Sequence, residues 1–187
     1  MFEYVVVITS IIIGLALAQL LQGLAQMIQD PRRQTVYWVH LVWVACMFLQ
    51  AVFWWWWEYR YRETDTWTFQ LYFFVLSYAF LVYLACALLF PRNIDDYGSF
   101  KIYFYSHRSW FFGVLAAGVL MDLADTWFKG ADYFASLGLQ YPVAMCAMFV
   151  LLVTGSITRN ERFHATFAVA GLAYQISWAL RMFETLD

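Results

Sequence analysis

Two aspartates, Asp122 and Asp125, are the residues of this sequence with the clearest capacity for chemistry, because both lie inside a long apolar run. A charged group near the centre of a bilayer costs about 2.5 kcal/mol or more unless it has a partner or water. Their i, i+3 spacing places both carboxyl groups on one face of a helix. Such a pair predicts either a site for a cation or proton, or the acidic half of a buried ion pair.

The candidate partner for these carboxylates is Arg181, which lies in another apolar run. At about 1.5 Å per residue, Arg181 and Asp125 each lie about 10 Å past the midpoint of their runs. We therefore expect an Asp125–Arg181 ion pair. Glu58 and Glu184 can join it from the same side of the membrane. The cluster is either an ion pair that locks two helices together or an ion or proton site, with ligand binding as a third interpretation.

Three glutamines, Gln19, Gln22 and Gln26, form a polar stripe on the first apolar run. Side-chain amides with small neighbours, here Ala16 and Gly23, commonly form hydrogen bonds between membrane helices. The spacing therefore favours contacts between helices over the lining of a pore.

Two histidines, His40 and His164, lie near the ends of two apolar runs, on the same expected side of the membrane. Paired imidazoles can bind the iron of a b-type haem. A histidine within a turn of a helix end more commonly forms hydrogen bonds at the membrane interface. The sequence favours this interfacial role, and a haem redox protein is the third functional hypothesis.

Motifs of known enzyme classes are absent from the sequence, which has no H-E-x-x-H, no G-x-S-x-G, no Walker glycine loop and no zinc-type spacing of cysteine and histidine. The cysteines Cys46, Cys86 and Cys146 lie in three different apolar runs, which is typical of small core residues. We expect no enzymatic activity, no metal site and no resident cofactor.

The composition indicates an integral membrane protein. Of the 187 residues, 64% are hydrophobic and only 13% are charged, whereas a soluble domain has about 25% charged residues. The formal net charge of -2 provides no cationic surface for nucleic acid. Membrane lipids are therefore the expected partners, together with further copies of the chain in a homo-oligomer.

The predicted fold is all-α: a polytopic membrane helix bundle of about six transmembrane helices, forming a single transmembrane domain over residues 1–187. Charge clusters and turn formers separate apolar runs of spanning length. The predicted spans are 4–28, 36–57, 67–90, 109–128, 138–157 and 163–183. Between spans three and four, aromatic residues at helical spacing and two basic residues on another face predict a short interfacial helix within 91–108.

The distribution of basic residues predicts the orientation in the membrane. With the N-terminus outside, seven basic residues lie on the inner side and four on the outer side, which favours two periplasmic termini. The four tryptophans Trp54 to Trp57 then form part of an outer aromatic belt.

Several local motifs characterise the chain: Trp54 to Trp57 with Glu58, Pro91, Asp122-x-x-Asp125-Thr126, Asn160-Glu161-Arg162-Phe163-His164 and Tyr174-Gln175-x-x-Trp178. With these motifs the whole chain resembles small six-span inner-membrane proteins of bacteria, a group with no named family. The resemblance implies a bacterial inner (plasma) membrane and transfers no activity. The sequence predicts an ion or proton channel or transporter, with a non-enzymatic scaffold or sensor acting through helix–helix contacts as the alternative.

Overall fold

The computed structural model describes residues 2–29, 35–64 and 66–182, except for the side chains of 63, 181 and 182. This part of the chain is a bundle of α-helices, as predicted. The helices are α1 (Phe2–Gln29), α2 (Trp38–Glu58), α3 (Phe69–Ala87), α4 (Phe100–Phe128), α5 (Ala131–Ser136), α6 (Gln140–Ile157) and α7 (Glu161–Met182), with short 3-10 helices η1 (Tyr59–Glu63) and η2 (Ile94–Asp96).

Six of these helices correspond to the six predicted spans. Five segments are long and apolar enough to cross a membrane: Phe2–Gln29, Trp38–Arg62, Phe69–Ala87, Phe100–Phe128 and Gln140–Ile157. The sixth helix, α7, has 22 residues, a sufficient length for a bilayer, but it is more polar than the others. The five apolar helices indicate a multi-pass membrane protein.

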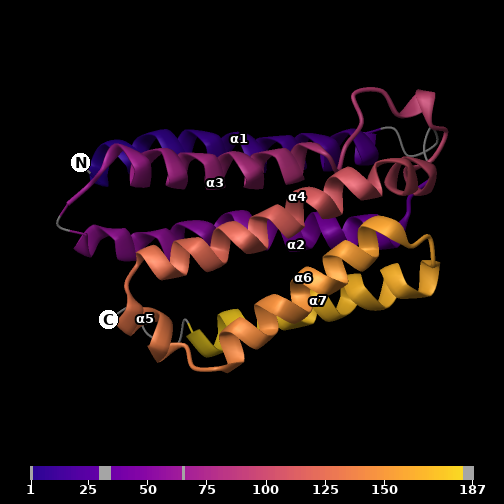
Figure 1. Cartoon of the computed structure of the whole chain (residues 1–187). Helices are drawn as coiled ribbons and strands as arrows, with labels where there is room; N and C mark the ends of the chain where they lie inside the picture. The colour runs from indigo at the N-terminus through magenta and orange to yellow at the C-terminus, as the bar shows by residue number, and fades with distance from the viewer. Residues whose placement is uncertain (1, 30–34, 65, 183–187) are drawn as a thin grey trace.

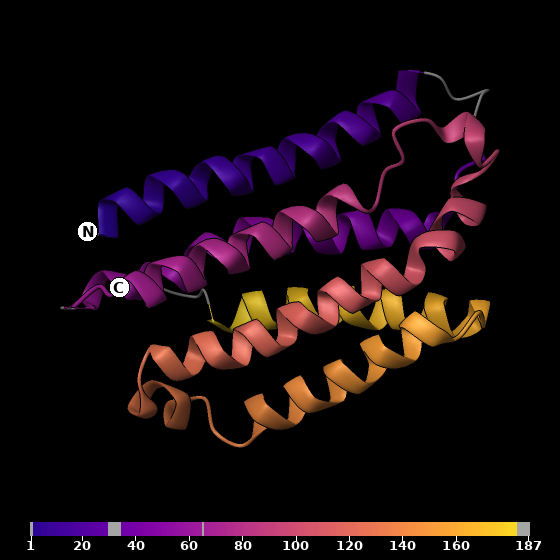
Figure 2. The same ribbon diagram turned by 45° about the horizontal axis from the view of Figure 1, so that its top comes forward.

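The long helices run along a common axis, so that their ends gather at two ends of the bundle (Figure 1). One end holds the start of α1, the α2–α3 connection, α5 and the end of α7; we call it the terminal end. The connections α1–α2, α3–α4 and α6–α7 lie at the opposite end. Helix α1 packs mainly against α3, α3 also packs against α4, α4 packs against α6, and α2 packs against α7. Figure 2 shows the same arrangement with α1 as an outer helix of the bundle.

Side-chain caps and glycines begin the helices where the apolar runs begin. The Thr68 hydroxyl accepts a hydrogen bond from the Leu71 amide at the start of α3, and the Ser99 hydroxyl accepts one from the Ile102 amide at the start of α4. Both arrangements satisfy amides that have no partner within the helix. Gly98, with φ of 71°, supplies the left-handed residue that separates α4 from the preceding loop.

The structure differs from the sequence prediction between spans three and four. Instead of a separate interfacial helix within 91–108, this segment contains the 3-10 helix η2 and the first turns of α4, which continues without a break to Phe128. The polar residues before the predicted fourth span do not end the helix, because Arg108 finds partners there. Its guanidinium donates hydrogen bonds to the carbonyl oxygens of Ile157 and Thr158 at the end of α6, where a helix has unsatisfied acceptors.

A close contact between α1 and the end of α3 depends on a glycine. A Cβ atom at Gly23 would overlap the ring of Phe90, so the aromatic side chain occupies the space that any other residue would fill. Phe90 in turn contacts the rings of His40 and Phe100. Gly23 therefore allows this aromatic group to join α1, α2, α3 and α4.

Candidate functional site

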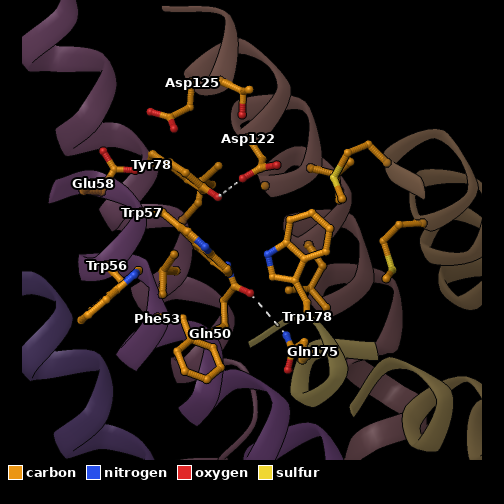
Figure 3. A pocket seen from close by; sticks show the side chains of 18 of the residues that line it. Gln50, Phe53, Trp56, Trp57, Glu58, Tyr78, Asp122, Asp125, Gln175 and Trp178 are labelled. Carbon is orange, nitrogen blue, oxygen red and sulfur yellow. Dashed lines mark hydrogen bonds between the residues drawn. The ribbon is translucent and has the colours of Figure 1, made fainter. Parts of the chain in front are cut away.

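A large cavity lies among α2, α3, α4, α6 and α7, with a volume of about 1150 Å³. Figure 3 shows three carboxyl groups, those of Glu58, Asp122 and Asp125, gathered at one end of this cavity. Glu58 is the last residue of α2, and the two aspartates lie in the last two turns of α4. Because both helices finish at the terminal end of the bundle, their acidic side chains meet there.

Lys129 neutralises part of this negative charge. Its Nζ lies 2.5 Å from Asp125 Oδ2 and 3.3 Å from Glu58 Oε1, and all three side chains are at most 4% exposed. Burial by itself lowers the pKa of Lys129, but the carboxylates of Glu58 and Asp125 more than offset this effect, and the pKa of Lys129 is raised. Lys129 is therefore a charged ammonium that joins the ends of α2 and α4.

Asp122 has a different environment from Asp125. Its Oδ1 accepts a hydrogen bond of 3.2 Å from the hydroxyl of Tyr78 on α3, and its Oδ2 accepts one of 2.7 Å from the hydroxyl of Tyr141 on α6. The ammonium of Lys129 is directed at Asp125 and Glu58 instead. Among the described side chains, Asp122 is thus held by neutral hydroxyl groups, at the wall of the cavity.

A tyrosine from the α2–α3 connection also forms a hydrogen bond with Asp125. The hydroxyl of Tyr61, in η1, donates a hydrogen bond of 2.8 Å to Asp125 Oδ1, and the Lys129 ammonium lies 5.0 Å from the centre of the Tyr61 ring. Tyr61 is 1% exposed. The 3-10 turn after α2 therefore folds back and closes the acidic end of the cavity.

A pair of glutamines lies farther along the cavity from the carboxyl groups. Gln175 Nε2 on α7 donates a hydrogen bond of 3.3 Å to Gln50 Oε1 on α2, and Trp57 and Trp178 lie between this pair and the carboxyl groups (Figure 3). Two buried acceptor atoms in the wall, Glu58 Oε2 and Gln175 Oε1, have no hydrogen-bond partner among the described residues. Both atoms are buried, as is the unpartnered indole nitrogen of Trp43 in the same wall.

An aromatic cluster lies beyond the glutamines, toward the opposite end of the bundle. The ring centroid of Trp43 lies 5.2 Å from that of Phe112 and 5.3 Å from that of Phe167, both in edge-to-face geometry. All three side chains are buried. This cluster separates the cavity from the opposite end.

The structure brings three of the predicted cluster residues together and leaves the other two untested. Glu58, Asp122 and Asp125 share one end of the cavity. The side chain of Arg181 and the whole of Glu184 lie outside the described residues, so the Asp125–Arg181 ion pair stays a prediction.

The glutamine stripe lies away from the cavity, on α1. Gln22 and Gln26 are exposed and Gln19 is half-buried. The two exposed amides point out of the bundle, so helix contacts through them would need another molecule.

The two histidines each lie in their own aromatic surroundings. His40 Nε2 is 2.6 Å from the Leu89 carbonyl oxygen and His164 Nε2 is 3.0 Å from that of Thr158. These distances match a nitrogen that donates to a helix-end carbonyl. The cavity beside His40 has a volume of about 10 Å³, which does not admit a porphyrin. The described residues therefore do not fit a haem between these side chains.

Four residues of the site are missed by sequence reasoning: Lys129, Tyr61, Tyr78 and Tyr141. The sequence pattern indicates Lys129 only as a stop signal after the fourth span, although its i, i+4 spacing from Asp125 is a recognised ion-pair spacing. The three tyrosines carry no local signal, because each reaches the aspartates from a different element.

Within the described residues, no group of three or more histidines, cysteines, aspartates or glutamates has the geometry of a metal site. Comparison with protein-family models, with curated proteins and with solved structures finds no match to the chain. The geometry of the site is therefore the basis for its proposed function.

Proposed function

We propose that the protein transports a proton or another cation across a bacterial inner membrane, with Asp122 as the group that binds it. The observation that carries this proposal is the position of Asp122. Its carboxylate lies in the wall of a cavity of about 1150 Å³ inside the bundle, and its described partners are the hydroxyl groups of Tyr78 and Tyr141.

The charges of the described side chains support this assignment. Glu58, Asp122 and Asp125 supply three carboxyl groups near a single ammonium, that of Lys129. Charge interactions are strong where water is scarce, so the two carboxyl groups in excess of this ammonium favour a proton or a cation beside them. Lys129 lies against Asp125 and Glu58, which leaves Asp122 as the one of these three carboxyl groups whose described hydrogen-bond partners are all neutral.

The two phenol groups suit a site that binds and releases a cation. Hydrogen bonds from Tyr78 and Tyr141 stabilise the ionised carboxylate, so Asp122 can exist without a bound cation. A permanent ion pair would instead hold an opposite charge against the carboxylate, as Lys129 does with Asp125. On this proposal the two aspartates divide the roles that the sequence left open: Asp125 locks helices and Asp122 binds the cation.

The test is proton and ion flux into proteoliposomes that contain the purified protein. An internal pH-sensitive dye reports proton entry when a potassium gradient with valinomycin sets the voltage. We expect Asp122→Asn to abolish flux while the fold is retained, because the amide keeps the shape and loses the titratable charge. Asp132→Asn, on the exposed surface of α5, is the matched control and should transport like the wild type.

Two results would overturn the proposal. One is wild-type vesicles that conduct no protons, Na⁺, K⁺ or Cl⁻ under applied voltage or tension. The other is an Asp122→Asn variant with unchanged flux.

A scaffold or sensor that acts through helix–helix contacts is the second candidate, and the exposed face of α1 favours it. Gly14 and Ala18 are one turn apart on α1, with Gly14 exposed, and a Cβ atom at Gly14 would meet nothing within 4 Å. Small residues at this spacing allow two membrane helices to approach closely, which suits a homo-oligomer. Silent vesicles together with a stable oligomer that Gly14→Leu dissociates would favour this function.

A further inference from the structure

We infer that the cavity binds an organic ammonium ion, specifically a protonated amine that carries N–H groups and an apolar body. This inference rests on the proposed function, since it takes Asp122 as the cation-binding group. An organic ammonium ion is a more specific substrate than the proton or cation of the proposed function.

The size of the cavity exceeds what an inorganic ion needs. A water molecule occupies about 30 Å³ of liquid, whereas pockets for organic ligands have volumes of about 300–1,000 Å³. The cavity of about 1150 Å³ is therefore on the scale of an organic molecule.

The walls between the two polar ends are apolar and rich in aromatic rings. Trp57 and Trp178 lie between the carboxyl groups and the glutamine pair (Figure 3), and Met145 and Met148 line the wall formed by α6. Indole rings attract cations placed over their faces, and methionine side chains adapt to ligands of irregular shape. This lining suits an ammonium ion joined to an apolar group.

The carboxylate of Asp122 selects the kind of ammonium ion. It lies in the wall of the cavity, and each of its two oxygens accepts one hydrogen bond, from Tyr78 and from Tyr141. An ionised carboxylate has about four lone pairs that accept hydrogen bonds, so Asp122 has capacity for the donors of a ligand. A protonated amine has N–H groups to donate, whereas a quaternary ammonium ion has none.

Two arginines, on the turn that follows Glu58, also line the cavity. Arg60 and Arg62 are exposed; Arg60 lies 4.4 Å from the centre of the Tyr133 ring, and Arg62 donates a hydrogen bond to the Tyr59 hydroxyl. Their charges are screened by solvent more than those of the buried carboxyl groups. The acidic end therefore determines the charge of the preferred ligand.

The test uses three probes that share one aromatic body: naphthylethylamine, its N,N,N-trimethyl derivative and the neutral naphthylethanol. Isothermal titration calorimetry on the protein in lipid nanodiscs measures each Kd. We expect the amine to bind at least about tenfold more tightly than the alcohol and the quaternary ion, because only the amine brings both positive charge and N–H donors.

Variants of cavity residues show which side chains bind the amine. Asp122→Asn should weaken amine binding by roughly ten- to hundredfold, which is the effect of losing one charge-assisted hydrogen bond, and should leave binding of the alcohol unchanged. Trp178→Leu should weaken binding of the amine. Trp110→Leu is its matched control, because Trp110 is 71% exposed on α4 and lies outside the cavity.

Equal binding of the three probes would overturn the inference, as would amine binding that Asp122→Asn and Trp178→Leu leave unchanged. A quaternary ion that binds as tightly as the amine would also overturn it, because hydrogen bonds from the ligand to Asp122 would then have no role. Proton flux that depends on Asp122 without any amine binding would refute the inference while the proposed function stands. If the protein binds the amine but its vesicles show no ion flux, the proposed transport function is refuted, and the inference that the cavity binds an organic ammonium ion stands.

Discussion

Replacing Lys129 with methionine should destabilise the protein severely, because it removes the ammonium from between two buried carboxylates. The Nζ–Oε1 distance of 3.3 Å to Glu58 corresponds to about 5 kcal/mol of attraction at an effective dielectric constant of about 20. The contact with Asp125 is shorter, at 2.5 Å. Desolvation offsets part of this attraction, and removal of one partner from a buried ion pair typically costs about 3–5 kcal/mol. We expect Lys129→Met to lower the free energy of unfolding by about that amount.

The matched control is the ion pair between Lys101 and Glu161. Its N–O distance is 2.6 Å, but its side chains are 46% and 60% exposed. An exposed pair contributes about 0–1 kcal/mol, so Lys101→Met should have little effect. The two substitutions change the same side chain in the same way and differ in burial.

A triple variant tests whether charge is the cause. Lys129→Met combined with Glu58→Gln and Asp125→Asn removes every charge of the group and keeps its shape, so it should recover much of the lost stability. Denaturant unfolding in detergent micelles, followed by circular dichroism, measures all four proteins. The reasoning is refuted if Lys129→Met costs no more than Lys101→Met, or if the triple variant is no more stable than Lys129→Met alone.

Four further predictions concern packing, pH, topology and cofactor content. Gly23→Ala should cost about 1–3 kcal/mol in thermal unfolding because its Cβ would overlap the Phe90 ring, whereas Gly14→Ala, on the open face of the same helix, should be neutral or stabilising. Because the pKa of Lys129 is raised above 10.5, its contribution to stability should be complete below that pH and lost only as the pH rises beyond it; a loss between about pH 8 and 10 in a pH series would contradict this. Cysteines introduced beside Lys129 should react with an impermeant maleimide from the periplasmic side and those beside Asn160 from the cytoplasmic side; labelling in the reverse sense would invert the topology. Purified protein should show no Soret band, because both buried histidines already bond to backbone carbonyl oxygens, and a Soret band would restore the haem hypothesis.

The helices were predictable because the bilayer imposes a simple rule on the sequence. Apolar runs of about 20 residues have to be helical in lipid, and each of the six predicted runs is a helix in the structure. The start of α4 was not predictable by the same rule. Polar residues there indicated a boundary, but Arg108 is accommodated by the carbonyl oxygens at the end of α6, a contact that no local pattern reveals.

The acidic cluster was predictable only in part. The spacing of Asp122 and Asp125 placed them on one face, and the expected position on the same side of the membrane brought in Glu58. The different surroundings of the two aspartates depend on Lys129 and on tyrosines from other elements, which tertiary packing alone brings together. The cavity has no signal in the sequence, since its existence depends on how the α2–α7 pair and the α4–α6 pair diverge from each other.

The pairing of helices along the chain determines when the cavity can first exist during synthesis. Helix α2 packs against α7, which leaves the ribosome after all the other described helices, while α4 packs against α6. Until α7 is inserted, Gln50 on α2 lacks its partner Gln175, although Trp43 can already pack against Phe111 and Phe112 of α4. A nascent chain that stops after α6 therefore lacks the wall that α7 supplies to the cavity.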